Sequence, residues 1–102
     1  MRMFNPPHPG EILKEDVLPE IAMTVGSFAT HLGVSRPHLS NILNGRASIT
    51  AEMDLKLSEA FGQPPGLWLR MQVTYDLWQA EQRPRQHVEL LSTAFTSTLT
   101  SP

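Results

Sequence analysis

The sequence contains no cysteine, so neither disulfide bonds nor thiolate-bound metals can stabilise the fold. It also lacks any run of about eighteen apolar residues that could cross a membrane. The first residues, MRMFNPPHPG, hold three prolines and no apolar segment, which argues against a signal peptide. We therefore expect a soluble, cytoplasmic chain of 102 residues that is long enough for one modest hydrophobic core.

Acidic residues are absent from positions 21–51, although the whole chain has ten Asp and Glu against eight Lys and Arg. Arg36, Arg46, His31 and His38 all fall within this stretch. Because phosphate neutralisation supplies most non-specific affinity for nucleic acid, a net charge of −2 at first counts against DNA binding. An acid-free face on an acidic body nevertheless suits a protein that docks on DNA by that face alone. The alternative is a chance gap among only ten acids.

Catalytic constellations are missing as well. The histidines lie at positions 8, 31, 38 and 87, and none has the His-x-x-x-His or Glu-x-x-His spacing of a metal site. Since no cysteine is present either, we expect no enzyme, no bound cofactor and no metal. Glu11, Glu15 and Asp16 could serve as paired acid–base carboxylates, but they are better interpreted as the solvated face of a helix or a contact for a basic partner.

The signals that are present are those of helices, and no strand candidate of any length occurs. Three expected helices begin at a capping hydroxyl, from Thr24, Ser35 and Thr50. Each of them ends at a glycine, from which we predict a left-handed backbone conformation. The predicted fold is all-α with five helices, which run from Pro9 to about Leu18 before Pro19, from Thr24 to Gly33, from Ser35 to Gly45, from Thr50 to Gly62, and from Pro64 and Pro65 to about Gln82.

The second and third helices predict a helix-turn-helix at about residues 25–44. Apolar residues at helical spacing give each helix one buried face, namely Val25, Phe28, Ala29 and Leu32, then Leu39, Ile42 and Leu43. Two short helices joined by a three-residue turn that contains a glycine cannot lie antiparallel, so they must cross steeply.

The last helix is apolar on two sides. One stripe comprises Leu67, Trp68, Met71, Tyr75 and Trp78, and the other comprises Leu69, Val73 and Leu77. The fourth helix has the single stripe Met53, Leu57, Ala60 and Phe61, with Asp54 and Leu55 off it. We expect residues 1–82 to form one domain that dimerises through Leu69, Val73 and Leu77, because twofold homodimers are the commonest assembly. The alternative is that the N-terminal segment or the 83–102 tail covers both stripes, the tail being held down by Leu90, Leu91 and Phe95.

An inward Leu39–Leu43 stripe fixes which residues of the third helix face outward. Five residues at its exposed N-terminal part are expected to contact DNA bases in the major groove, namely Ser35, Arg36, Pro37, His38 and Asn41. Four others are placed for phosphates, namely Thr24, Ser27, Asn44 and Arg46. For each of them the alternative is a solvated polar residue, and for Asn44 beside Gly45 it is a helix-ending cap.

Three segments of the chain resemble the HigA-type antitoxins of the Xre (lambda-repressor-like) helix-turn-helix family. The segments are HPGEIL, TVGSFATHLGVSRPHLSNILNGRASITAEMDLKLSEAFG and PPGLWLRMQVTYDLW, in order over about residues 8–80. The resemblance implies a five-helix lambda-repressor-like fold, a homodimer on a palindromic operator, and a small basic HigB-type ribonuclease toxin as partner. By position it carries base reading to Ser35, Arg36, Pro37, His38 and Asn41, and phosphate contact to Asn44 and Arg46. Pro37 and His38 stand where polar or hydroxylic residues are more usual, so the operator sequence does not transfer.

Three functions therefore compete. The first is an antitoxin that also represses its own toxin–antitoxin operon. The second is a toxin-binding module whose helix-turn-helix persists only as scaffold. The third is a stand-alone transcriptional regulator without a toxin.

Overall fold

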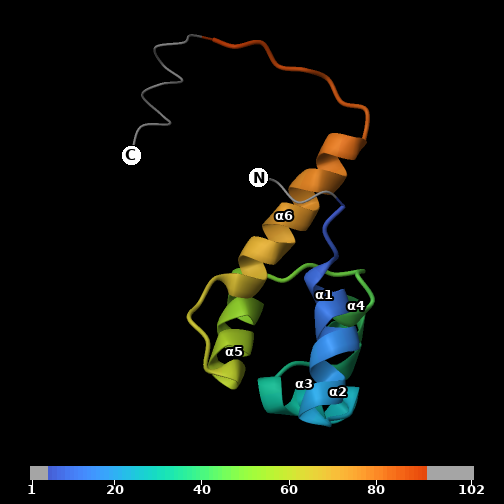
Figure 1. Ribbon diagram of the computed structural model, residues 1–102, viewed down its shortest axis with the longest axis vertical. Coiled ribbons are helices and arrows are strands. Elements are labelled where there is room, and N and C mark those ends of the chain that lie inside the picture. The colour runs from blue at the N-terminus through green and yellow to red at the C-terminus, as the bar shows by residue number, and fades with distance from the viewer. Residues whose placement is uncertain (1–4, 92–102) are drawn as a thin grey trace.

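The structure, a computed structural model, describes residues 5–91, and within this range the only regular structure is helical. Figure 1 shows the elements in chain order. They are α1 (Pro9–Ile12), the π-helical segment η1 (Leu13–Val17), α2 (Leu18–Ile21), α3 (Val25–Leu32), α4 (Arg36–Leu43), α5 (Ala51–Phe61) and α6 (Leu67–Gln82). Because α1, η1 and α2 follow one another without a break, residues 5–91 hold five helices, and the predicted all-α, lambda-repressor-like fold is confirmed.

The first helix is longer than the sequence predicts. Pro19 was expected to end it at Leu18, but the helix continues to Ile21. The reason is the π-helical segment, in which the Leu18 N–H donates to the Leu13 carbonyl five residues back. This wider turn places Pro19 in the first turn of α2, where a proline's missing N–H and fixed φ are tolerated.

The helix-turn-helix is formed by α3 and α4, as expected. The Thr24 hydroxyl accepts a hydrogen bond from the Ser27 N–H at 3.1 Å, and the Ser35 hydroxyl accepts one from the His38 N–H at 3.2 Å. Gly33 ends α3 with a φ of +74°, a left-handed conformation that glycine adopts without strain. The predicted inward residues of both helices are buried, except Val25, which is half-buried.

The N-terminal helix packs closely on the helix-turn-helix, beside which it stands in Figure 1. Gly10 lies directly against the carbonyl oxygen of Ile42, so close that a Cβ on residue 10 would overlap it. Only a glycine allows this approach. Leu13, three residues further along, is fully buried and belongs to the hydrophobic core.

Aromatic rings join α3, α5 and α6. Phe28 stacks on Phe61, and Phe61 meets Trp68 at an interplanar angle of 49°; in each pair the ring centroids are 6.0 Å apart. The Trp68 indole N–H donates to the Gln63 side chain at 3.0 Å, which satisfies its polar atom at the edge of the core. Ala60 is exposed, so its predicted place in the buried stripe of α5 was wrong.

Two buried polar side chains connect these helices, and sequence spacing had not singled out either of them for burial. Asp54 is 3% exposed and accepts hydrogen bonds from the Gly66 N–H at 2.7 Å and the Leu69 N–H at 2.9 Å. It thereby caps α6 from α5, and Gly66 at the start of α6 has no side chain for the task. Gln72 accepts a hydrogen bond from the Ile49 N–H at 2.8 Å.

Of the two apolar sides of α6, one is mostly covered, although Leu67 at its start is 37% exposed, and the other is mostly exposed. Trp68 is buried, and Met71, Tyr75 and Trp78 are half-buried. On the other side Leu69 is half-buried, whereas Val73 is 49% exposed and Leu77 is 57% exposed. Residues 5–91 therefore leave Val73 and Leu77 of the outer stripe largely uncovered and cover Leu69 in part.

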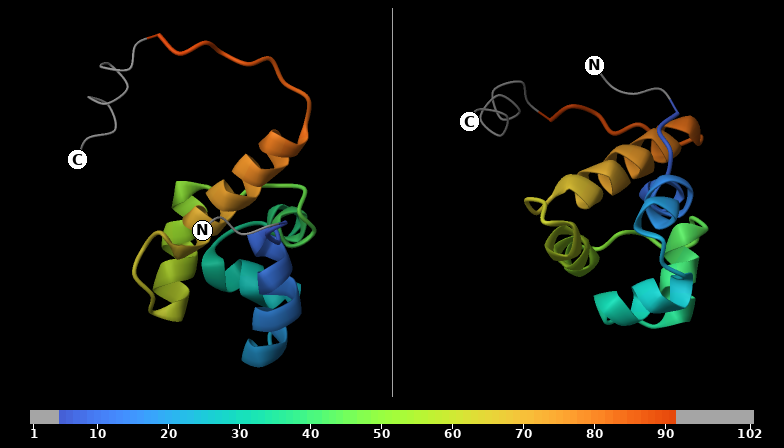
Figure 2. Two further views of the ribbon diagram at one scale, coloured as in Figure 1. Left: turned by 45° about the horizontal axis from the view of Figure 1, so that its top comes forward. Right: turned by 60° about the horizontal axis from the view of Figure 1, so that its bottom comes forward.

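The chain leaves α6 at Arg83 and continues to residue 91 without secondary structure, extending away from the helices in Figures 1 and 2. Leu90 and Leu91 are exposed by 67% and 91%, so they do not hold this segment on the domain. Phe95, the third expected anchor, lies outside the described residues. No helix within residues 5–91 is long and apolar enough to span a membrane.

Candidate DNA-binding surface

The five side chains expected to read bases lie on one exposed edge of the molecule. Leu39 and Ile42 are fully buried and fix the rotation of α4. The opposite side of α4 and its N-terminal end are therefore exposed. The exposed residues there include Ser35, Arg36, Pro37, His38 and Asn41. Ser40, between the two faces, is half-buried.

The N-terminal ends of α3 and α4 come together at this edge. The aliphatic part of Arg36 lies beside Gly26 in the first turn of α3, which has no side chain to displace it. Thr24 and Ser27, expected to contact phosphates, are exposed on that same turn. The Thr24 hydroxyl donates to the Ser27 hydroxyl at 3.0 Å, so the two form one polar group at a helix N-terminus, where backbone N–H groups favour an anion.

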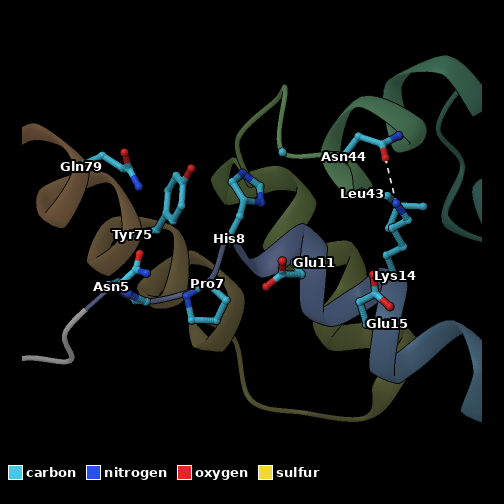
Figure 3. A pocket seen from close by; sticks show the side chains of 12 residues that line it. Asn5, Pro7, His8, Glu11, Lys14, Glu15, Leu43, Asn44, Tyr75 and Gln79 are labelled. Carbon is cyan, nitrogen blue, oxygen red and sulfur yellow. Dashed lines mark hydrogen bonds between the residues drawn. The ribbon is translucent and has the colours of Figure 1, made fainter.

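Asn44, at the other end of α4, has partners within the chain. Its amide donates to the Ser40 carbonyl at 2.9 Å, as the helix-cap alternative requires, and its Oδ1 accepts from the Lys14 ammonium at 3.2 Å. Figure 3 shows the hydrogen bond between Lys14 and Asn44. Both residues line a polar cavity of about 520 Å³, which Glu11 and Glu15 line as well. Lys14, which the sequence pattern does not identify as a functional residue, thereby places a positive charge beside a predicted phosphate contact.

Arg46 is held in place by the way α4 ends. The Gly45 N–H donates to the Ile42 carbonyl at 3.1 Å and the Arg46 N–H to the Asn41 carbonyl at 2.8 Å. This paired pattern, with Gly45 at a φ of +74°, is a Schellman motif. It turns the chain sharply after the recognition helix and leaves the Arg46 side chain exposed.

His8 connects three parts of the chain beneath this turn, and Figure 3 shows its ring between α6 and the loop after α4. Its Nδ1 accepts from the Gly10 N–H at 2.9 Å, its ring also hydrogen-bonds to the backbone of Ala47, and it meets Tyr75 edge-on with centroids 5.0 Å apart. Burial lowers the pKa of His8 below its usual 6.5, although the nearby Asp76 carboxylate opposes this shift. The neutral ring that results can accept from Gly10.

The same loop is fixed at its far end by Gln72. Its Oε1 accepts from the Ile49 N–H, and its amide donates to Asp76 at 3.0 Å. Together His8 and Gln72 attach residues 45–49 to α6, so Arg46 has a fixed position relative to the last helix. The sequence offered a partial signal only for His8, which stands just before a proline at a helix start.

The expected absence of acids holds for α3, α4 and the following loop, but Glu11 and Glu15 line the same cavity as Asn44, so acids border the C-terminal end of α4. The acid-free segment 21–51 supplies α3, α4 and the following loop, whereas Glu11, Glu15 and Asp16 are exposed on the N-terminal helix. Within residues 5–91, no group of three or more His, Asp or Glu side chains could hold a metal ion.

Comparisons with known proteins agree with this arrangement. A family described as Helix-turn-helix (HTH_3) matches residues 20–68. The antitoxin HigA-1 of Vibrio cholerae is 34% identical, over 86% of this chain and 83% of its own length. The antitoxin HigA of Pseudomonas aeruginosa, solved with the higBA promoter, superposes with a TM-score of 0.72 at 32% identity, over 76% of this chain and 84% of that one.

A third similar structure is that of the antitoxin GraA in complex with its operator. It superposes with a TM-score of 0.72 at 35% identity and covers 87% of this chain and 97% of that one. The exposed recognition helix and these similarities lead to one conclusion: the chain belongs to the Xre-type helix-turn-helix family of DNA-binding regulators and antitoxins that includes HigA.

Proposed function

We propose that this protein is a cytoplasmic, dimeric antitoxin that binds a palindromic operator, represses its own toxin–antitoxin operon, and neutralises a basic HigB-type ribonuclease toxin by direct binding. The observation that carries the proposal is the recognition helix α4, which presents only uncharged and basic residues to solvent in a segment without acids. Structures of antitoxins similar to this chain have been solved with promoter and operator DNA, which supports the proposed operator binding.

In this proposal α4 enters the major groove with its N-terminal end. Arg36 pairs with a guanine edge and Asn41 with an adenine edge, and Pro37 lies on a thymine methyl. Ser35 and His38 flank them. Thr24, Ser27, Asn44 and Arg46 bind phosphates on either side and set the register of the helix in the groove.

Dimerisation follows from the weak charge of a single copy. One copy presents only Arg36 and Arg46 as full positive charges within residues 21–51, too few for tight binding alone. The outer stripe of α6, in which Val73 and Leu77 are exposed and Leu69 is half-buried, supports pairing through that helix. Two symmetric recognition helices then match a palindromic operator.

Toxin binding is supported by acidic residues outside the acid-free segment 21–51. Glu11, Glu15 and Asp16 are exposed on the N-terminal helix, where they suit a basic protein. A neighbouring gene for a basic protein of roughly a hundred residues would supply this partner, and a duplex of that operon's upstream DNA is the probe for the repressor activity.

The test measures the affinity of the purified protein for upstream and random duplexes over a range of salt concentrations. Asn41→Ala should lower affinity for the upstream duplex by roughly 1–3 kcal/mol and relax base preference. Arg46→Ala should weaken binding to all duplexes about equally and lower the salt slope by about 0.9 per contact.

Equal losses on both duplexes from both substitutions would contradict these roles. The toxin-binding module without operator binding is favoured if the wild-type protein fails to retain upstream DNA at low salt yet binds the neighbouring gene product. Retention of the DNA with no toxin gene beside it would identify a stand-alone regulator instead.

A further inference from the structure

We propose that Arg83, at the end of α6, is a phosphate-binding residue that acts beside Arg46 and extends the DNA contact beyond the helix-turn-helix. This inference rests on the proposed operator binding and adds to it a contact from the helix that carries the dimer stripe. Arg83 lies outside the helix-turn-helix, and the sequence pattern did not identify it as a DNA contact.

Arg83 lies in line with residues of α6 that face the loop after α4. Gln72, Asp76, Gln79 and Arg83 are spaced as i, i+4, i+7 and i+11, so they follow one another along a single face of α6. Gln72 holds this face against the loop after α4 through its hydrogen bond with Ile49. Arg83 therefore continues the row that faces the loop carrying Arg46.

Arg46 and Arg83 share a cleft. It has a volume of about 330 Å³ between residues 45–48 and the face of α6, and Arg46 and Arg83 both line it, together with Ser48 and Gln79. These side chains offer hydrogen-bond donors to an anion. Such a cleft opens beside the end of the recognition helix, where the sugar–phosphate backbone of a groove-bound duplex has to pass.

The guanidinium groups of Arg46 and Arg83 supply the positive charge of this cleft. Within residues 5–91, neither guanidinium has a hydrogen-bond or ion-pair partner, so both are available to an external anion. Asp76 is the acid among the lining residues, so the two arginines give the cleft a formal net charge of +1. Burial favours the neutral form of His8, which leaves the two arginines as the cations of the cleft.

A duplex is the occupant that best fits a pair of cations beside α4. Each DNA strand carries one phosphate about every 3.4 Å along the helix axis, so two cations across a small cleft can bind neighbouring phosphates. Arg83 lies about a quarter-turn from the outer stripe Leu69, Val73 and Leu77, so a dimer formed through that stripe leaves it accessible. The Arg83–Val88 segment that follows contains no acid to repel the duplex.

The experiment compares the salt dependence of DNA binding for the full chain and three variants, on the upstream duplex and on a random one. Arg83→Ala should lower the slope of log affinity against log salt by about 1.8 per dimer, one contact from each copy. Between 50 and 200 mM salt this difference amounts to about twelvefold. Arg83→Lys should keep the slope, because it keeps the charge.

Arg70→Ala is the matched control, since it removes an exposed arginine from another face of the same helix. It should leave the salt slope unchanged. An Arg83→Ala slope equal to that of the wild type, on a protein that binds DNA, would overturn this inference and leave the proposed function intact. Failure of the wild type to bind either duplex would overturn both. A slope change confined to the upstream duplex would also overturn it, because a phosphate contact carries no sequence information.

Discussion

Replacing Asp54 by alanine is expected to destabilise the fold more than any other loss of a single carboxylate in α5. The Asp54 carboxylate receives two backbone N–H groups, from Gly66 at 2.7 Å and Leu69 at 2.9 Å, at a helix start that no other side chain caps. A hydrogen bond to a charged group contributes about 1.5–3 kcal/mol, and an unpaired buried donor costs about 1–3 kcal/mol. The negative charge also interacts favourably with the helix dipole of α6.

Both N–H groups are only partly buried, so water recovers some of this loss. We therefore expect Asp54→Ala to lower the free energy of unfolding by about 2–4 kcal/mol. For a domain of this size, about 4–8 °C per kcal/mol gives a decrease in Tm of roughly 8–32 °C. Asp54→Asn retains one acceptor, so its stability should lie between that of the wild type and that of Asp54→Ala.

Urea unfolding followed by tryptophan fluorescence measures this change in stability. Trp68 reports on it because it is 3% exposed and is the second residue of the helix that Asp54 caps. Glu59→Ala is the control, since it removes an exposed carboxylate from the same helix. If Asp54→Ala and Glu59→Ala agreed within about 0.5 kcal/mol, the typical effect of a surface change, the capping argument would be refuted.

Three further changes probe other contacts. Since the pKa of His8 is lowered in the fold, the unfolded chain binds more protons, and stability is lost as pH falls below about 6.5. His8→Asn can still cap α1 and should reduce that loss, which urea titrations at pH 7.5 and 5.5 measure. Gln72→Leu leaves the Ile49 N–H unpaired, so we expect a loss of about 1–3 kcal/mol and faster hydrogen exchange of that amide. Leu77→Asp should weaken the proposed dimer at least about 30-fold in sedimentation experiments, because burying the exposed half of this leucine in both copies contributes about 2–3 kcal/mol.

Each of these changes has a control that alters the same residue type at an exposed position. The controls are His31→Asn, Gln82→Leu and Leu91→Asp. A change that had no more effect than its control would contradict the contact assigned to that residue.

The helices and their ends could be predicted from the sequence because local rules determine them. Hydroxyl caps at Thr24, Ser35 and Thr50 and glycines at the helix ends involve residues a few positions apart, and apolar spacing identifies the core. The same spacing predicted the two sides of α6. The exposed face of α4 followed from the burial of its opposite side.

The remaining features depend on neighbours that are distant in sequence. Asp54 and Gln72 are polar residues that spacing alone assigns to no buried face, and their burial is explained only by N–H groups of Gly66, Leu69 and Ile49 that the fold brings to them. The proximity of Lys14 to Asn44 likewise requires the packing of α1 on α4. The continuation of the first helix past Pro19 requires a π-helical turn, for which no local rule was available.

The attachment of residues 45–49 to α6 at both ends has a consequence for the length of the operator. If two copies pair through α6, the loops held by His8 and Gln72 make each recognition helix rigid with respect to the twofold axis. The distance between the two helices is then a property of the fold and cannot adjust to the DNA. One base pair inserted between the half-sites rotates one of them by about 35° around the duplex, so a single insertion should abolish simultaneous binding of both copies.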